Sequence, residues 1–210
     1  MEKHQTYYNL LDAVKEKGCP ICFLVKKSIH KMMDDFLYEQ VNDPKVRLEI
    51  KAAFGFCGRH AWQLQKFGDG LGLCIIYDDL LTTLQQSVKE HGSFPKQEKI
   101  CPFCNDSQEI EQRYVSTFIE YFDDVEFNSY FKQSFGLCLN HLISVINSCR
   151  NKKITENLKE MEFQKRESLI AELKEFHRKH DYRFAKEGYG PEGDSWIRAI
   201  EKLAGKDGVF

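Results

Sequence analysis

Hydrophobic positions recur at helical spacing along almost the whole chain. After the first cysteine pair, an apolar stripe is formed by Met32, Met33, Phe36, Leu37 and Val41. Residues three and four apart lie on one face of an α-helix, so this stripe predicts an amphipathic helix. Asn42-Asp43-Pro44 predicts its end, because proline cannot continue a helix. No run of alternating apolar and polar residues is long enough to predict a strand.

Two longer helices and a short one are predicted further along the chain. The first follows the loop Gly68-Asp69-Gly70 and ends at Gly92, and the second runs from about Ile154 to Lys179. A final short helix, Trp196 to Leu203, stops before Gly205. We therefore predict an all-α protein, in which two pseudo-repeated helical units are joined by a C-terminal long helix packed across them.

Six of the eight cysteines fall into two matching sets. Each set is C-P-x-C followed, after a nearly equal gap, by C-x-x-H. The first set contains Cys19, Cys22, Cys57 and His60, and the second contains Cys101, Cys104, Cys138 and His141. A Phe-Gly pair precedes both C-x-x-H motifs, which indicates an internal duplication. The predicted division is 1–92 for the first repeat, 93–150 for the second, and 151–210 for the long helix and a capping helix, integrated with the repeats.

The local sequence of each motif favours a metal centre. In C-P-x-C the first cysteine can be an N-cap, proline takes the first helical position, and the second cysteine falls in the first turn. In C-x-x-H the two ligands stand at i and i+3 on one helix face. Each set then places three thiolates and an imidazole between two helix N-termini, whose dipoles favour a negative centre. We expect each C-P-x-C to share a centre with the C-x-x-H that follows it.

The donor type leaves two classes of centre open. Three cysteines and one histidine suit a tetrahedral zinc ion, and we predict two zinc ions with a structural role, because four protein ligands leave no position for a substrate. The same ligands can hold iron–sulfur clusters, which would make the chain a redox or electron-transfer protein. The remaining thiols, Cys74 and Cys149, lie in apolar stretches and are predicted to fill the core.

Composition limits the partners. The chain has 210 residues, 42% of them hydrophobic, so it can bury a core. Its net charge of −2 lacks the broad basic field that non-specific nucleic-acid binding needs, so no nucleic acid is expected. We also expect no membrane span and no export signal. The absence of an export signal predicts a cytoplasmic location, where cysteines stay reduced. Reduced cysteines favour metal binding over disulfides.

The motifs resemble those of a known group of sequences. The succession begins with Cys-Pro-Ile-Cys and Gly-Phe-Cys-Gly-Arg-His, continues through Cys-Pro-Phe-Cys and Gly-Leu-Cys-Leu-Asn-His, and ends near Asp181-Tyr182-Arg183-Phe184. It is similar to an uncharacterised prokaryotic family, catalogued as a domain of unknown function, over almost the whole chain. The resemblance implies one integrated unit in a prokaryotic cytoplasm and supplies no mechanism. It also implies that the family pattern includes Arg59, Tyr77, Asp78, Arg183 and Trp196.

Three hypotheses of function follow. The leading one is a structural two-zinc scaffold that presents a surface or groove to a protein or a small molecule. The second is the iron–sulfur redox protein. The third is an enzyme with a pocket between the repeats, around the five residues that the resemblance singles out. The pattern carries no recognisable catalytic constellation, so it favours a protein that is not an enzyme.

Overall fold

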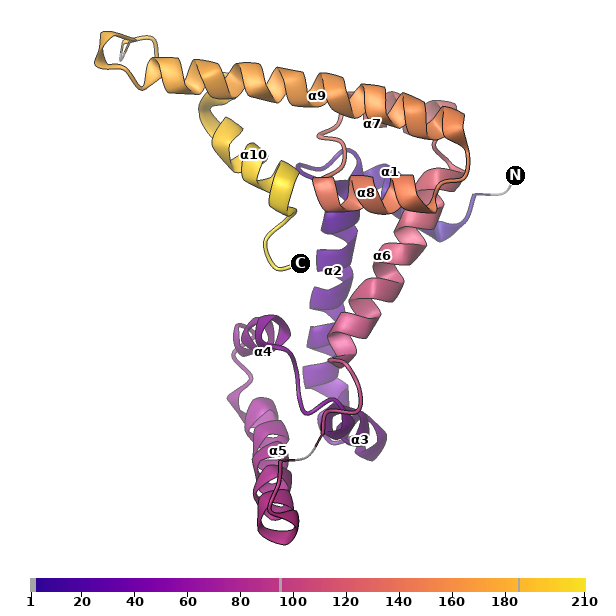
Figure 1. Cartoon of the computed structure of the whole chain (residues 1–210), viewed down its shortest axis with the longest axis vertical. Coiled ribbons are helices and arrows are strands. Elements are labelled where there is room, and N and C mark those ends of the chain that lie inside the picture. The colour runs from indigo at the N-terminus through magenta and orange to yellow at the C-terminus, as the bar shows by residue number, and fades with distance from the viewer. Residues whose placement is uncertain (1–2, 95, 185) are drawn as a thin grey trace. The chain divides into compact units, whose positions relative to one another are not determined.

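The computed structural model describes residues 3–94, 96–184 and 186–210, and in these ranges all of the regular secondary structure is helical (Figure 1). The prediction of an all-α fold is confirmed. The α-helices of the described ranges are α1 (Gln5–Ala13), α2 (Pro20–Asp35), α3 (Pro44–Ala52), α4 (Gly58–Gln65), α5 (Gly70–His91), α6 (Pro102–Glu120), α7 (Val125–Gln133), α8 (Leu139–Ser148), α9 (Lys152–Lys179) and α10 (Ser195–Ala204). Three short helical turns complete them: the π-helical η1 (Phe36–Gln40) and the 3₁₀ turns η2 (Tyr182–Phe184) and η3 (Pro191–Asp194).

Contacts divide the chain into two compact units. We call Met1–Val25 with Glu111–Phe210 the terminal unit, and Lys26–Ile110 the central unit. Helix α2 begins in the terminal unit and ends in the central one, whereas α6 begins in the central unit and ends in the terminal one. The units therefore do not coincide with halves of the sequence. The division into 1–92, 93–150 and 151–210 was based on the sequence repeats and stays a prediction.

The core of the terminal unit is built on aromatic side chains. Phe118, Phe122, Phe127 and Phe131 pack with ring centroids 5.0 to 6.1 Å apart. Phe118 lies on α6 and Phe122 in the turn just after its end, whereas Phe127 and Phe131 lie four residues apart on one face of α7. Edge-to-face and offset contacts between aromatic rings add to the stabilisation that comes from burying their surface.

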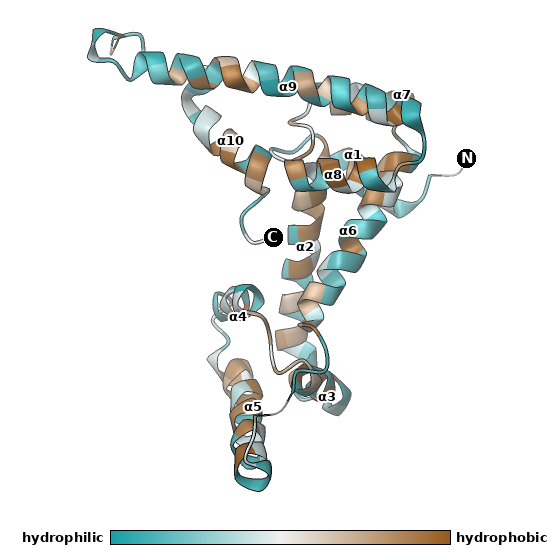
Figure 2. Cartoon of the chain, in the orientation of Figure 1, coloured by the Kyte–Doolittle hydropathy of each residue, from teal (hydrophilic) through white to brown (hydrophobic). Residues whose placement is uncertain are grey.

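Helix α10 packs on α9 in an unusual way. Its polar residues lie against α9, where Lys202 pairs with Glu162 and Arg198 pairs with Glu172. Its large apolar residues are instead partly or largely exposed, from Ile197 at 44% to Leu203 at 64%. In Figure 2 the hydrophobic colour runs along much of this helix. The inner contacts of α10 are therefore polar, the reverse of an ordinary amphipathic helix.

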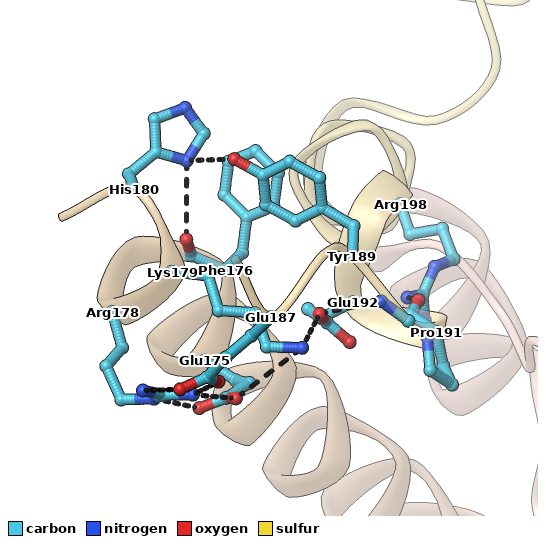
Figure 3. A network of polar contacts seen from close by, with 11 residues as sticks. Glu175, Phe176, Arg178, Lys179, His180, Glu187, Tyr189, Pro191, Glu192 and Arg198 are labelled. Carbon is cyan, nitrogen blue, oxygen red and sulfur yellow. Dashed lines mark hydrogen bonds and ion pairs between the residues drawn. The ribbon is translucent and has the colours of Figure 1, made fainter. Parts of the chain in front are cut away.

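The end of α9 is fastened by ion pairs (Figure 3). Lys179 Nζ donates to Glu192 Oε1 at 2.7 Å, and the same carboxylate oxygen accepts from the Gly190 amide at 2.8 Å. Arg178 pairs with Glu175 one turn before it and with Glu187 beyond the helix end. These contacts hold η3 and the chain that leads to α10 against α9.

The central unit has a smaller core. It contains Ile50 of α3, Leu64 of α4 and Ile76 of α5, all nearly inaccessible to solvent. Asp79 of α5 pairs with Arg47 and Lys51 of α3, at 2.7 Å in each case. Within the described ranges of both units, no helix combines the length and the apolar character that crossing a membrane requires.

Candidate metal centres

Each of the four cysteine motifs starts a helix, as the sequence predicts. Cys57 and Cys138 have extended backbones and are the N-cap residues of α4 and α8. The carbonyls of Cys19 and Cys101 accept the first backbone hydrogen bonds of α2 and α6, from Phe23 and Asn105. Proline occupies the first position of α2 and of α6, where its missing N–H costs no hydrogen bond.

A glycine with positive φ turns the chain into each C-x-x-H motif. Gly55 has φ +90° and Gly136 has φ +82°. A Cβ on Gly136 would lie 2.2 Å from Glu162 Oε1, so both the backbone conformation and the space exclude a side chain there. These bends direct Cys57 and Cys138 toward their partner ligands.

The eight predicted ligands gather into two groups of four, but with exchanged partners. The terminal site contains Cys19, Cys22, Cys138 and His141, and the central site contains Cys57, His60, Cys101 and Cys104. The prediction that Cys19 and Cys22 share a centre with Cys57 and His60 is therefore wrong, as is the corresponding pairing of the second set. Each site takes C-P-x-C from one repeat and C-x-x-H from the other.

Helix length gives the physical reason for this correction. Helix α2 has 16 residues and α6 has 19. At about 1.5 Å per residue, they carry the chain roughly 24 and 28 Å along their axes from the cysteines at their starts. The next C-x-x-H motif in the sequence is therefore reached in the other compact unit. The spacing of residues within a motif contains no information about how far a helix carries the chain away from its first cysteines.

The donors of the terminal site converge on one point. The sulfurs of Cys19, Cys22 and Cys138 each lie 3.3 Å from His141 Nδ1, and the Sγ atoms of Cys22 and Cys138 are 3.6 Å apart. A tetrahedron of zinc ligands at ordinary bond lengths has edges of about 3.5 to 3.8 Å. All four residues are at most 2% exposed, so this site is sealed from solvent.

The central site has the same geometry but is more open. The sulfurs of Cys57, Cys104 and Cys101 lie 3.3, 3.4 and 3.5 Å from His60 Nδ1, and Cys57 Sγ is 3.5 Å from Cys104 Sγ. His60 and Cys101 are buried, whereas Cys57 and Cys104 are partly exposed. The two sites thus share one donor set and differ in access to solvent.

Burial and sulfur–sulfur contacts set the protonation of the metal-free ligands. Burial, assisted by the charge of Arg59, lowers the pKa of His60 to about 4, which keeps its imidazole neutral and able to bind a metal. Burial raises the pKa of the Cys104 thiol to about 12. Hydrogen bonds with Cys19 and Cys22 hold the pKa of Cys138 well below the usual thiol value. A metal cation would displace the protons that remain.

Two charged residues that are not ligands lie beside the sites, and only one of them, Arg59, was singled out from the sequence. Glu111 Oε1 lies 3.6 Å from His141 Nε2, the ring nitrogen that faces away from the sulfurs. The distance is too long for a hydrogen bond, so the contact between this carboxylate and the imidazole ring is electrostatic. At the central site, Arg59 Nη2 lies 4.0 Å from Cys104 Sγ. Its charge opposes the net negative charge of three thiolates around a divalent ion.

A buried ion pair holds the loop that leads into Cys138. Glu162 of α9 is fully buried, and its Oε1 accepts from the Leu137 amide at 2.6 Å. Lys202 of α10 pairs with Glu162 Oε2 at 2.7 Å and donates to the Phe135 carbonyl at 2.9 Å. We call these two residues the Glu162–Lys202 latch. No sequence signal identified it, because both partners are distant from Cys138 along the chain.

The five further residues singled out from the sequence do not gather in one unit. Arg59 lies beside the central site, and the pKa of Tyr77 is raised by burial and by the charge of Cys101. Asp78 is exposed on α5. The other two belong to the terminal unit, where exposed Arg183 pairs with Asp181 and Trp196 lies on the outer face of α10. An enzyme pocket between the repeats stays a prediction.

Neither remaining cysteine is a core residue, and this corrects a second prediction. Cys74 is exposed on α5 and Cys149 is partly exposed at the end of α8. Cys74 precedes the buried Ile76 by two residues, which places it about 200° around the helix from that side chain. An apolar neighbourhood in the sequence therefore did not predict burial.

Comparisons with known proteins agree with the motifs. The chain matches the family described as "Family of unknown function (DUF6062)" twice, over residues 1–99 and 88–208. It is 32% identical over 203 residues to a protein of Caldicellulosiruptor sp. (strain Rt8B.4) described as "Uncharacterized 23.9 kDa protein in xynA 3'region". That alignment covers 93% of this chain and 99% of its relative. No solved structure matches significantly.

Proposed function

We propose that this chain, which belongs to the DUF6062 family, binds two structural zinc ions and uses them to form a helical scaffold for a partner. The observation that carries the proposal is the convergence of four soft or borderline donors in each unit. Their atoms all lie within 4.8 Å of one another, with three sulfurs around one imidazole nitrogen. This donor set is typical of zinc.

The spacing of the donors supports a single ion over an iron–sulfur cluster. In a cubane cluster each cysteine binds a different iron, so the sulfurs must stand apart around the inorganic core. The sulfur–sulfur distances of 3.5 and 3.6 Å instead correspond to ligands that share one ion. Four protein ligands complete the tetrahedron and leave no position for a metal-bound substrate, which supports a structural role.

Each ion would join segments that are distant in the sequence. At the terminal site it would connect the start of α2 to the start of α8, and at the central site the start of α4 to the start of α6. A structural zinc site contributes on the order of 10 kcal/mol of binding free energy that is coupled to folding. Because the ligands must be thiolates, we also propose that the protein works in a reducing compartment, the cytoplasm.

Metal analysis of the full chain, purified with and without oxygen, tests the proposal. We expect two zinc ions per chain, no acid-labile sulfide and no visible absorption in either preparation. Iron with sulfide in the anaerobic preparation would instead establish the redox alternative. A chain that contains neither metal, and that does not gain structure when zinc is added, would refute both.

A further inference from the structure

A cavity of about 520 Å³ lies in the central unit, beside the central site. Its floor is aromatic: Phe36 and Phe103 are buried, Phe56 is partly buried, and the ring centroids lie 5.3 to 5.9 Å apart. Aliphatic side chains, among them Val46 and Ile50 of α3, form its walls. Its volume falls in the range of about 300 to 1,000 Å³ that is typical of small-molecule sites.

Most of the charged side chains that line the cavity are acidic. Asp35, Glu49 and Asp106 line it, together with a single cationic side chain, Lys99. Asp35 is already paired with Lys31, at 2.6 Å. Glu49 and Asp106, from α3 and α6, form no ion pair with any described part of the chain. An apolar floor is thus combined with two carboxylates that are available to a cation.

We propose that this cavity binds a small organic ammonium ion with an apolar, preferably aromatic, body. The body would lie against the rings of Phe36, Phe56 and Phe103, and the ammonium group would contact Glu49 and Asp106. Ring faces also attract cations, which adds to the same preference. An acid of equal size would meet two like charges and is disfavoured.

The cavity shares its walls with the central metal site. Phe56 precedes Cys57, and Pro102 and Phe103 lie between Cys101 and Cys104. The ring of Phe103 also lies 5.9 Å from that of His60. Loss of the ion would release the two segments that carry these rings. This dependence on metal rests on the proposed function, whereas the charge preference does not.

The test uses the full chain and two probes of matched size, 2-phenylethylammonium and 3-phenylpropionate. Binding is followed by calorimetry and by amide chemical shifts. We expect the amine to bind and to shift the amides of Phe56 and Phe103, with the acid at least about tenfold weaker, a difference of about 1.4 kcal/mol. Equal affinity for both probes, or no binding of the amine, would overturn the proposal.

Variants locate the binding site. Glu49→Gln should weaken binding of the amine about fivefold, because it removes one partly solvated ionic contact. The matched control, Glu90→Gln on α5, removes an exposed carboxylate that does not line the cavity and should leave the affinity unchanged. Val46→Phe should occupy part of the cavity and weaken binding of the amine. Affinity that persists in both Glu49→Gln and Val46→Phe would refute this location, independently of how either variant folds.

Metal content separates the two proposals. If the chain contains zinc and the amine does not bind, the cavity proposal fails alone. If the chain contains no metal and the amine binds with the expected charge preference, the zinc proposal fails and the cavity proposal stands. Removal of zinc by a chelator should abolish binding of the amine, and binding that survives would refute the link between the two sites.

Discussion

At the residue scale, the parts of the site that were predicted correctly depend on neighbours in the sequence. Cys101 caps α6 because Pro102 follows it, and Cys138 and His141 share a helix face because three residues separate them. Glu111 shows the opposite case. It reaches His141 only because α6 passes α8, and no local pattern distinguishes it from the many other glutamates of the chain.

The corrected pairing changes what a histidine substitution should do. His60→Ala should reduce the zinc content from two ions to one and loosen residues 26–110, because His60 binds with Cys101 and Cys104. Metal analysis and hydrogen exchange measure the two effects. His91→Ala, at an exposed histidine outside both sites, is the control and should keep both ions. Loss of protection around Cys19 and Cys22 instead would support the pairing within each repeat.

Glu192 provides a test of the charges at the end of α9. Contacts with the Gly190 amide and Lys179 lower its pKa from 4.5 to about 2. Because the folded pKa is depressed, its stabilising effect is present above about pH 4.5 and is lost as the pH falls toward 2. A carboxyl NMR titration should find this low pKa, and Lys179→Met should raise it. An ordinary pKa in the unmodified chain would contradict the contacts in Figure 3.

At the scale of elements, helix boundaries were predictable and helix faces were less so. Gly92 adopts the left-handed conformation that ends α5, and Asn151 caps the start of α9, both through local chemistry. The faces depend on distant packing. In α10 the apolar face is exposed, whereas Lys202 points inward and pairs with Glu162 of α9. The buried face of α10 therefore depends on a residue of α9 and cannot be predicted from the sequence of α10 alone.

The Glu162–Lys202 latch should control the terminal site without containing a metal ligand. Glu162→Gln removes the charge that holds the Leu137 amide, and we expect zinc affinity there to fall about 10- to 100-fold. Competition with a chromophoric chelator measures this for each ion. Glu172→Gln breaks another α9–α10 ion pair that does not touch the ligand loop, so it is the matched control. Equal weakening by both substitutions would mean that the latch supports only general stability.

At the scale of the whole molecule, the two repeats are interlaced through their ligands. The duplication correctly identified the eight donors but not their partners, because equivalent motifs can be joined within a repeat or between repeats. The lengths of α2 and α6 decide this, and their effect is visible only in three dimensions.

Cutting the chain between the repeats tests the interlacing. A protease site inserted between Lys96 and Gln97, in an exposed segment, allows the full folded chain to be cleaved after purification. Each half then holds two ligands of each site, so the halves should elute together with two zinc ions. Chelation should separate them, as size-exclusion chromatography would show. Halves that part while each keeps one ion would contradict the observed pairing.

The exchanged pairing also bears on how such a chain can arise. One repeat alone carries two half-shells of ligands that do not complete one another, so a protein of half this length could fill its metal sites only by associating with a second copy. Two identical copies related by a twofold axis would satisfy both sites at once. Joining their genes in tandem would make that association permanent, and would free the two centres to diverge into one sealed and one open to solvent.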